Sequence, residues 1–210
     1  MRKVVLQVLE TLEILYPDAS AELNYKNPFE LLIAVILSAQ CTDIRVNQVT
    51  KILFDVAPTA EALSQLPLEA VEAIIKPCGL YKTKAKNIVQ TASLLCKLHE
   101  GNVPSAHDAL TQLPGVGQKT ANVVVSNAFG IPAIAVDTHV FRVANRIGLA
   151  KAKNVEQTEE QLKKAIPIDR WTRAHHQLIF HGRRVCKARS PMCEVCTIKP
   201  FCEDYKKRSK

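Results

Sequence analysis

The sequence lacks any apolar run long enough to cross a membrane. Leu31–Leu37 is far shorter than the roughly 20 residues that a bilayer-spanning helix needs. A secretory leader is not indicated either, because Glu10 and Glu13 interrupt the apolar residues near the N-terminus. Repeats, low-complexity segments and long linkers are also missing from the 210 residues. We therefore expect an intracellular protein and not a secreted or membrane protein.

The cysteine count does not suit a disulfide framework. Seven is an odd number and favours free thiols or a metal site in a reducing compartment. Cys41, Cys78 and Cys96 lie in or beside apolar segments, so we expect them to be buried small hydrophobic residues. The other four share one loop-rich segment with the spacing C-x6-C-x2-C-x5-C: Cys186, Cys193, Cys196 and Cys202. This spacing indicates a metal site, and by itself it leaves a zinc ion and an iron–sulfur cluster both open.

The positive charge of the chain is concentrated near its C-terminus. Of the formal net charge of +8, none arises from residues 1–169, which hold seventeen basic and seventeen acidic side chains. Residues 170–210 hold eleven Lys or Arg against three Asp or Glu. Such a basic region is expected for a protein that binds a nucleic acid or an anionic membrane. Lys206–Lys210 fits a solvated tail, so the arginines before it are the stronger candidates for a binding surface.

Helical periodicity runs through almost the whole sequence, whereas strand signals are weak. Apolar residues recur at helical spacing from Val5 to Tyr16, and Pro17 ends that segment. Asn27, Pro28 and Glu30 supply a cap, an N1 proline and an N3 acid to a central, nearly all-apolar helix over 29–39. The pattern predicts an all-α fold with further helices at about 44–56, 68–76, 82–99, 106–112, 118–129, 138–148, 155–165 and 170–185.

Residues 113–139 carry the clearest functional signal. A glycine-bracketed turn, Leu113-Pro-Gly-Val-Gly117, precedes a helix. Gly115 and Gly117 have no Cβ, so they can adopt positive φ and let a polyanion approach the N–H groups that the helix leaves unpaired. Lys119 lies in the first helical turn, where the helix dipole disfavours an ammonium and favours a nucleophilic amine. A tight corner with a solvated lysine would have the same residues, so the pattern alone leaves both interpretations open.

The segment Leu113-Pro-Gly-Val-Gly-Gln-Lys-Thr-Ala-Asn-Val-Val124, followed by Val136-Asp-Thr-His139, resembles the catalytic region of the endonuclease III family. The resemblance extends over nearly the whole chain. Members of that family are DNA glycosylases of base excision repair that also act as abasic-site lyases. The resemblance implies two helical lobes that flank a DNA-binding cleft. One is a six-helix barrel at 22–131 with a helix–hairpin–helix at about 106–129. The other is a four-helix iron–sulfur cluster domain formed by 1–21 with 132–210.

The resemblance also implies roles for single residues. Lys119 would attack C1′ of an oxidised pyrimidine nucleotide and form a Schiff base, and β-elimination would then nick the strand 3′ to the lesion. Asp137 would aid deprotonation of Lys119, although it is equally suited to cap the next helix. Leu80 would wedge into the base stack and Gln40 would fill the vacated space. Their structural alternatives are a buried loop anchor and a helix C-cap.

The remaining implied contacts involve phosphates and cofactors, on a protein expected to bind damaged double-stranded DNA as a monomer at the nucleoid. His139 would contact a phosphate, with a packed helix histidine as the alternative. A 4Fe-4S cluster would bind the four cysteines of the 186–202 loop, and a monovalent cation would bind the hairpin carbonyls. We also expect four basic residues in and before that loop to bind DNA: Arg183, Arg184, Lys187 and Arg189.

Two other functions remain open. A monofunctional mismatch or uracil glycosylase would share the fold, but enzymes of the adenine-mismatch type lack a lysine at the position of Lys119 and carry a further C-terminal domain. A non-enzymatic helix–hairpin–helix protein would share every feature except the pair Lys119 and Asp137. That pair therefore distinguishes an enzyme from a binding module. Cys41, where related proteins commonly carry a small residue, adjoins the lesion-side loop.

Overall fold

The computed structural model describes residues 2–208, and every regular element in that range is a helix. The chain divides into two compact units. The inserted unit is Glu22–Ile131, and the split unit combines Met1–Ala21 with Pro132–Lys210. None of the helices between residues 2 and 208 is long and apolar enough to cross a membrane.

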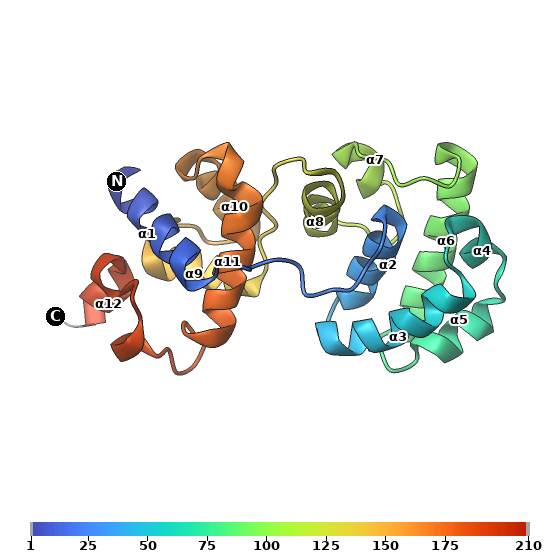
Figure 1. Ribbon diagram of the computed structural model, residues 1–210, viewed down its shortest axis with the longest axis horizontal. Helices are drawn as coiled ribbons and strands as arrows, with labels where there is room; N and C mark the ends of the chain where they lie inside the picture. Colours follow the sequence, from blue (N-terminus) through green and yellow to red (C-terminus); the bar gives the residue numbers. More distant parts are fainter. Residues whose placement is uncertain (1, 209–210) are drawn as a thin grey trace. The chain divides into compact units, whose positions relative to one another are not determined.

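The inserted unit is built around one helix whose residues are almost all buried (Figure 1). That helix is α2, and Leu31 to Leu37 are all shielded from solvent by α3, α6 and α8. Its start is fixed as predicted, because the Asn27 side chain accepts from Glu30 N at 2.9 Å and Glu30 Oε2 accepts from Lys26 N at 2.7 Å. The helices of this unit are α2 (Pro28–Ser38), α3 (Asp43–Val56), α4 (Ala60–Gln65), α5 (Leu68–Ile75), α6 (Tyr81–His99), α7 (His107–Thr111) and α8 (Gln118–Phe129).

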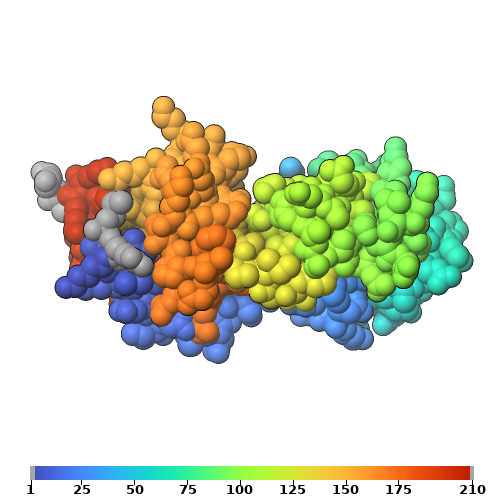
Figure 2. Space-filling view, turned by 90° about the horizontal axis from the view of Figure 1, so that it is seen from above, coloured from blue at the N-terminus to red at the C-terminus, as the bar shows by residue number. Residues whose placement is uncertain are grey.

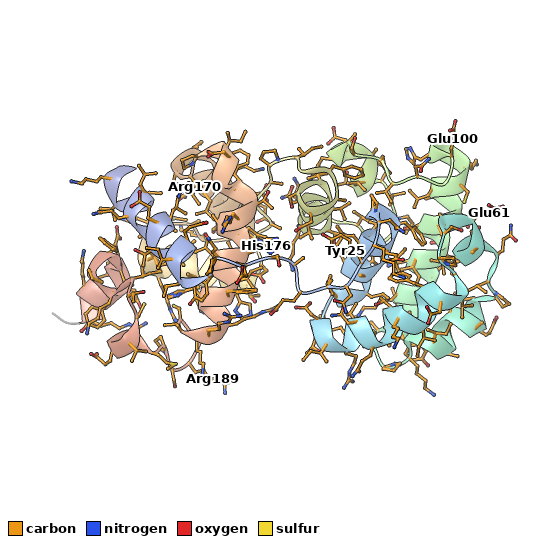
Figure 3. The ribbon with its side chains drawn as sticks, in the orientation of Figure 1. Tyr25, Glu61, Glu100, Arg170, His176 and Arg189 are labelled. Atoms are coloured by element: carbon orange, nitrogen blue, oxygen red, sulfur yellow. The ribbon has the colours of Figure 1, made fainter. Side chains whose placement is uncertain are left out.

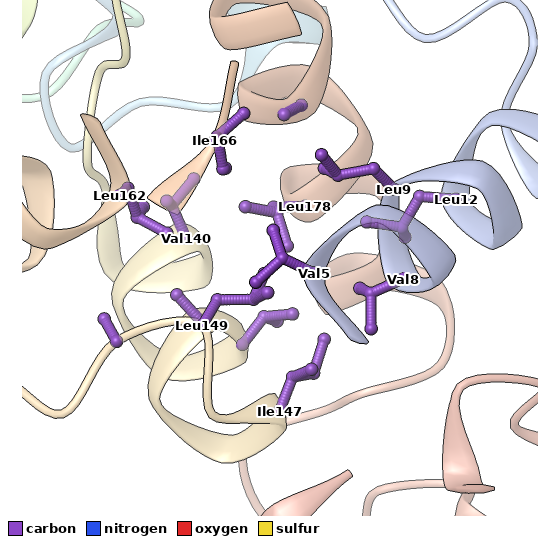
Figure 4. Close-up of a cluster of buried hydrophobic side chains, with 14 of the residues drawn as sticks. Val5, Val8, Leu9, Leu12, Val140, Ile147, Leu149, Leu162, Ile166 and Leu178 are labelled. Carbon is purple, nitrogen blue, oxygen red and sulfur yellow. The ribbon is translucent and has the colours of Figure 1, made fainter. Parts of the chain in front are cut away.

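The split unit draws its core from both ends of the chain. Val8, Leu9 and Leu12 of α1 pack with Val140 of α9 and Leu178 of α11 in one apolar cluster (Figure 4). Figure 2 shows the same neighbourhood from another side, with the blue N-terminal segment beside the orange and red C-terminal segments. The helices of this unit are α1 (Arg2–Leu15), α9 (Thr138–Ile147), α10 (Val155–Ala165), α11 (Trp171–Arg184) and α12 (Glu203–Arg208), with short 3-10 turns at Ile168–Arg170, Cys193–Val195 and Lys199–Phe201.

The helical periodicity did not predict the short elements α4 and α12. In α4 only Ala60 and Leu63 are buried, so six residues contain too few apolar positions to reveal a period. Instead, Thr59 fixes the start of α4 by accepting from Ala62 N at 3.2 Å, and the helix packs on α6. The α12 segment has no buried residue, so it carries no apolar pattern at all.

Candidate active site and cysteine pocket

Apolar and polar contacts together anchor the hairpin between α7 and α8 to the rest of the inserted unit. Leu113 and Val116 are buried, and Val116 N donates to Leu113 O at 3.1 Å across the turn. From α6, Thr91 Oγ1 donates to Pro114 O at 3.0 Å. Gly115 has φ +78°, and a Cβ there would lie 3.0 Å from Asn87 Nδ2 and 3.2 Å from a methyl group of Ile36. Both the backbone conformation and the packing therefore require glycine at position 115.

Gly117 serves the hairpin in a different way. Its φ of −95° and ψ of −179° are extended, so of the two glycines only Gly115 uses the positive φ that the sequence suggested. Gly117 is the N-cap of α8 and provides no side-chain cap for the first N–H groups of that helix. A Cβ at Gly117 would have nothing within 4 Å. Lys119 lies exposed in the first turn of α8. The arrangement offers unpaired N–H donors and an amine to an incoming anion.

Asp137 begins α9 in the split unit. Its side chain is half-buried, and Oδ1 accepts from Val140 N at 2.7 Å, which is the N-cap interaction expected from the sequence. The cap uses Oδ1, so the Oδ2 oxygen is not part of it. Two residues later, His139 Nδ1 lies 3.2 Å from Arg142 Nη2, an interaction that orients the imidazole ring. The capping role of Asp137 leaves the carboxylate available for chemistry as well.

Gln40 and Leu80 occupy two adjoining loops of the inserted unit. Both have left-handed backbones, with φ of 53° and 58°, a conformation that residues other than glycine seldom adopt and that often marks a functional position. Leu80 is 63% exposed, so the alternative of a buried loop anchor is wrong for this residue. Gln40 is also exposed and follows Ala39, which is the C-cap of α2. An apolar side chain and an amide are thus presented to solvent on strained backbone.

The four cysteines of the 186–202 loop line one pocket with residues of α9 and α11. Burial raises the pKa of the Cys196 and Cys202 thiols, so a bound cation would be needed to hold them as thiolates. Across residues 2–208, no three His, Cys, Asp or Glu side chains are grouped tightly enough for a single metal ion. Four sulfur donors around one pocket are the ligand set of either a zinc ion or an iron–sulfur cluster.

Buried polar groups connect this pocket to the rest of the split unit. His181 of α11 is buried, with Nε2 3.6 Å from Cys196 Sγ and Nδ1 3.1 Å from the Tyr16 hydroxyl. Burial lowers the pKa of His181 to about 4, so the ring is neutral near pH 7. The hydroxyl of Tyr16, just beyond α1, is therefore linked to a predicted cluster ligand through one imidazole.

Two arginines of α9, which the sequence analysis did not single out, hold the cysteine loop in place. Arg142 donates to Gly182 O at 2.9 Å and to Cys186 O at 3.1 Å. Arg146 donates to Lys187 O and Ala188 O, each at 2.8 Å, and its Nη1 lies 3.6 Å from Cys186 Sγ. Arg142 and Arg146 are four residues apart, so both lie on one face of α9. This spacing is the only sign of the pair in the sequence, and it does not indicate that they bind a loop some 40 residues farther along the chain.

The basic residues predicted to bind DNA have different surroundings. The Arg184 guanidinium lies 4.4 Å from the Phe180 ring centre, an arrangement that fixes its orientation. Lys187 and Arg189 are exposed, and the carbonyl of Lys187 is held by Arg146. Figure 3 shows Arg189 pointing outward from the loop that follows α11. Arg183 is exposed near the end of that helix. The charged groups near the cysteine loop are therefore presented on a backbone that is anchored from α9.

Comparisons with known proteins identify the family of the chain. The model of the HhH-GPD superfamily of base excision DNA repair proteins matches residues 33–168. Endonuclease III of Escherichia coli K12 is 51% identical over 203 residues, covering 97% of this chain and 96% of that protein. Endonuclease III of Bacillus subtilis 168 is 48% identical over 203 residues, covering 96% and 93%. The solved structure of a trapped endonuclease III–DNA covalent intermediate has a TM-score of 0.94 and 48% identity, covering 100% of this chain and 99% of that one.

Proposed function

Because the chain belongs to the endonuclease III family of HhH-GPD base excision repair proteins, we propose that it removes oxidised pyrimidines from duplex DNA and then cleaves the strand at the abasic site. The observation that carries this proposal is the placement of Lys119. Its amine is exposed in the first turn of α8, beside a helix N-terminus that no side chain caps. A phosphate can bind there while the amine reaches the sugar beside it.

In the proposed reaction, the neutral amine of Lys119 attacks C1′ and the N-glycosidic bond breaks, with its electron pair leaving on the base. The resulting amino sugar opens to a Schiff base between Lys119 and C1′. Loss of a proton from C2′ then expels the 3′ phosphate by β-elimination and nicks the strand. Asp137 assists by accepting the proton that Lys119 loses and by stabilising positive charge on the sugar. Its cap to Val140 N keeps the carboxylate in one orientation.

Extrusion of the damaged nucleotide leaves a gap that other residues must fill. We assign the wedge to Leu80, because its apolar side chain is 63% exposed on a strained loop, and the vacated position to Gln40 on the adjoining loop. The hairpin glycines Gly115 and Gly117 and the imidazole of His139 are proposed to contact phosphates. Four basic residues near the cysteine loop are also proposed to bind phosphates: Arg183, Arg184, Lys187 and Arg189.

We further propose that the pocket of the split unit holds a 4Fe-4S cluster. Cys186, Cys193, Cys196 and Cys202 would be its ligands, which is consistent with their common pocket and with membership of the family. When bound, the cluster supplies four iron–thiolate bonds that hold the loop together. Its binding free energy then contributes to the folding of a segment with little apolar material of its own. The protein would act in the cytoplasm, at the nucleoid, with a monovalent cation on the hairpin carbonyls as a further ligand.

Borohydride trapping on a duplex with an abasic site or thymine glycol tests the proposed reaction. We expect wild-type protein to form a covalent adduct with DNA and Lys119→Ala to form none. Gln118→Ala, a change at the preceding residue of the same exposed turn, is the matched control and should still form the adduct. If wild type gives no adduct but cuts the N-glycosidic bond, the protein is a monofunctional glycosylase. Tight binding without either reaction would identify a non-catalytic DNA-binding protein.

A further inference from the structure

Two cysteines outside the cluster pocket lie together in the inserted unit. The thiols of Cys41 and Cys78 are neighbours, since Cys41 is among the groups that raise the pKa of Cys78, although 37 positions separate them in the sequence. Cys78 is fully buried, whereas Cys41 is half-buried and reachable from solvent. The expectation of buried small hydrophobic residues is confirmed for Cys78 and wrong for Cys41 and Cys96, which are half-buried. Cys41 is thus a partly accessible thiol with a second thiol as its neighbour.

Contacts on both sides of this pair hold the two loops together. Arg45 Nη1 donates to Pro77 O at 3.3 Å, directly before Cys78. A Cβ at Gly79, directly after Cys78, would lie 3.8 Å from Gln40 O. Farther along, the buried ammonium of Lys84 donates to Leu37 O at 2.9 Å. Two hydrogen bonds and one close approach of the backbone therefore support the proximity of the thiols.

The positions of the thiols give this contact its functional interest. Cys41 follows Gln40, and Cys78 stands two residues before Leu80. Gln40 and Leu80 are the two residues with strained backbone that we assign to the gap left by the extruded nucleotide. A covalent bond between the thiols would tie those two loops to each other at their bases.

We propose that Cys41 and Cys78 are a redox-active thiol pair that closes to a disulfide when the protein meets a peroxide, and that the disulfide restrains the Gln40 and Leu80 loops. The effect on repair rests on the function proposed above, whereas formation of the disulfide does not. The pair would make base removal sensitive to the oxidants that also damage DNA bases.

The reaction balances with a peroxide as the only oxidant. The Cys41 sulfur attacks one peroxide oxygen, the O–O bond breaks, and Cys41 becomes a sulfenic acid with release of water. The Cys78 sulfur then attacks the Cys41 sulfur, the S–O bond breaks, and a second water leaves. Two thiols are oxidised by two electrons and hydrogen peroxide is reduced to two waters. Burial and the neighbouring thiol raise the pKa of Cys78 to about 11, so the half-buried Cys41 is the thiol that meets the peroxide, and Cys78 reacts only in the second step.

The disulfide should slow removal of a base more than cleavage of an existing abasic site. Removing a base requires the loops to adjust while a stacked nucleotide leaves the helix, whereas an abasic nucleotide has no base to unstack. We expect single-turnover removal of thymine glycol to fall about tenfold in the oxidised protein, since a small misplacement of positioning groups has large kinetic effects. Strand cleavage at a preformed abasic site should change much less.

Peptide mapping of the intact, cluster-containing protein tests the cross-link itself. After treatment with hydrogen peroxide and digestion with trypsin, peptide 27–45 should be joined to peptide 52–82, at the summed mass less two hydrogens. Dithiothreitol should release both peptides and restore the rate of base removal. Sulfenic acid on Cys41 without a link to Cys78, or a link to Cys96 instead, would overturn the proposal.

Three variants separate this pair from oxidation of the cluster. Each is compared with its own untreated sample. Cys41→Ser and Cys78→Ala should lose both the linked peptides and the reversible fall in rate, while Cys96→Ser, a half-buried thiol of α6, should keep both. An equal fall in rate in Cys41→Ser would refute the effect on the loops. A reduced protein that fails to form the borohydride adduct would refute the proposed enzymatic function and leave the peptide result standing.

Discussion

Adding a methyl group should affect the stability of the protein differently at the two glycines of the hairpin. Gly115→Ala forces an L-residue into φ +78° and places a Cβ 3.0 Å from Asn87 Nδ2 and 3.2 Å from a methyl group of Ile36. The left-handed backbone costs about 1–2 kcal/mol and the crowded contact a further ~1–2 kcal/mol. We therefore expect the free energy of unfolding to fall by about 2–4 kcal/mol in urea titrations, with an unchanged m-value.

Gly117→Ala is the matched change two residues away. Alanine adopts the extended backbone of Gly117 without strain, and the added methyl group meets no atom within 4 Å. The free energy of unfolding should change by less than about 1 kcal/mol, the usual size of an N-cap effect. The methyl group would occupy the space proposed for a phosphate, so affinity for duplex DNA should fall about tenfold, or about 1.4 kcal/mol. Equal losses of stability in the two variants would refute this reading of the hairpin.

Three further predictions concern the split unit. Asp137→Asn should keep the cap and the stability but lower single-turnover base removal by about a hundredfold. Asp137→Ala should lose the cap as well, which lowers the free energy of unfolding in urea by about 1 kcal/mol. Equal activity of Asp137→Asn and wild type would contradict the proposed role. Burial lowers the pKa of both His176 and His181 to about 4, below their value in the unfolded chain. The stability that each contributes is therefore full above pH 6.5 and falls toward pH 4 by about 1.4 kcal/mol per unit. His176→Gln should remove about half of that slope, because His181 keeps its own contribution, and an unchanged slope refutes the assignment. Cys196→Ser should abolish the visible absorbance of an iron–sulfur cluster and lower the melting temperature; retention of both would exclude Cys196 as a ligand.

The sequence predicted those features that depend on local pattern. The cap at Asn27, the long apolar helix after it and the helix at 118–129 follow from spacing alone, and the structure confirms them. The all-α fold was predicted from helical periodicity and the family from motifs within short segments, and the structure and the comparisons confirm them. The roles assigned to Lys119, Asp137 and the other site residues remain predictions.

The features that the sequence did not predict depend on contacts between distant segments. In the sequence, Arg142 and Arg146 look like ordinary residues of an amphipathic helix. Only the fold brings backbone carbonyls at the end of α11 and in the cysteine loop within hydrogen-bonding distance of them. Cys41 and Cys78 were each interpreted as isolated core residues, because no local pattern indicates that two loops place their thiols together. Gly117 differs from Gly115 through its neighbours in space, which a shared Gly-Val-Gly motif does not reveal.

The division of one unit between the two ends of the chain has a consequence for protein synthesis. The apolar face of α1 is synthesised before its partners Val140 and Leu178, which follow only after the whole inserted unit has been translated. Residues 22–131 have their own core around α2 and can fold during that interval. Throughout it, Val8, Leu9 and Leu12 stay uncovered, which makes α1 the segment on which a chaperone would act. The cysteine loop emerges after these helices, and its buried Ile198 belongs to the same core, so this core is completed only together with that loop.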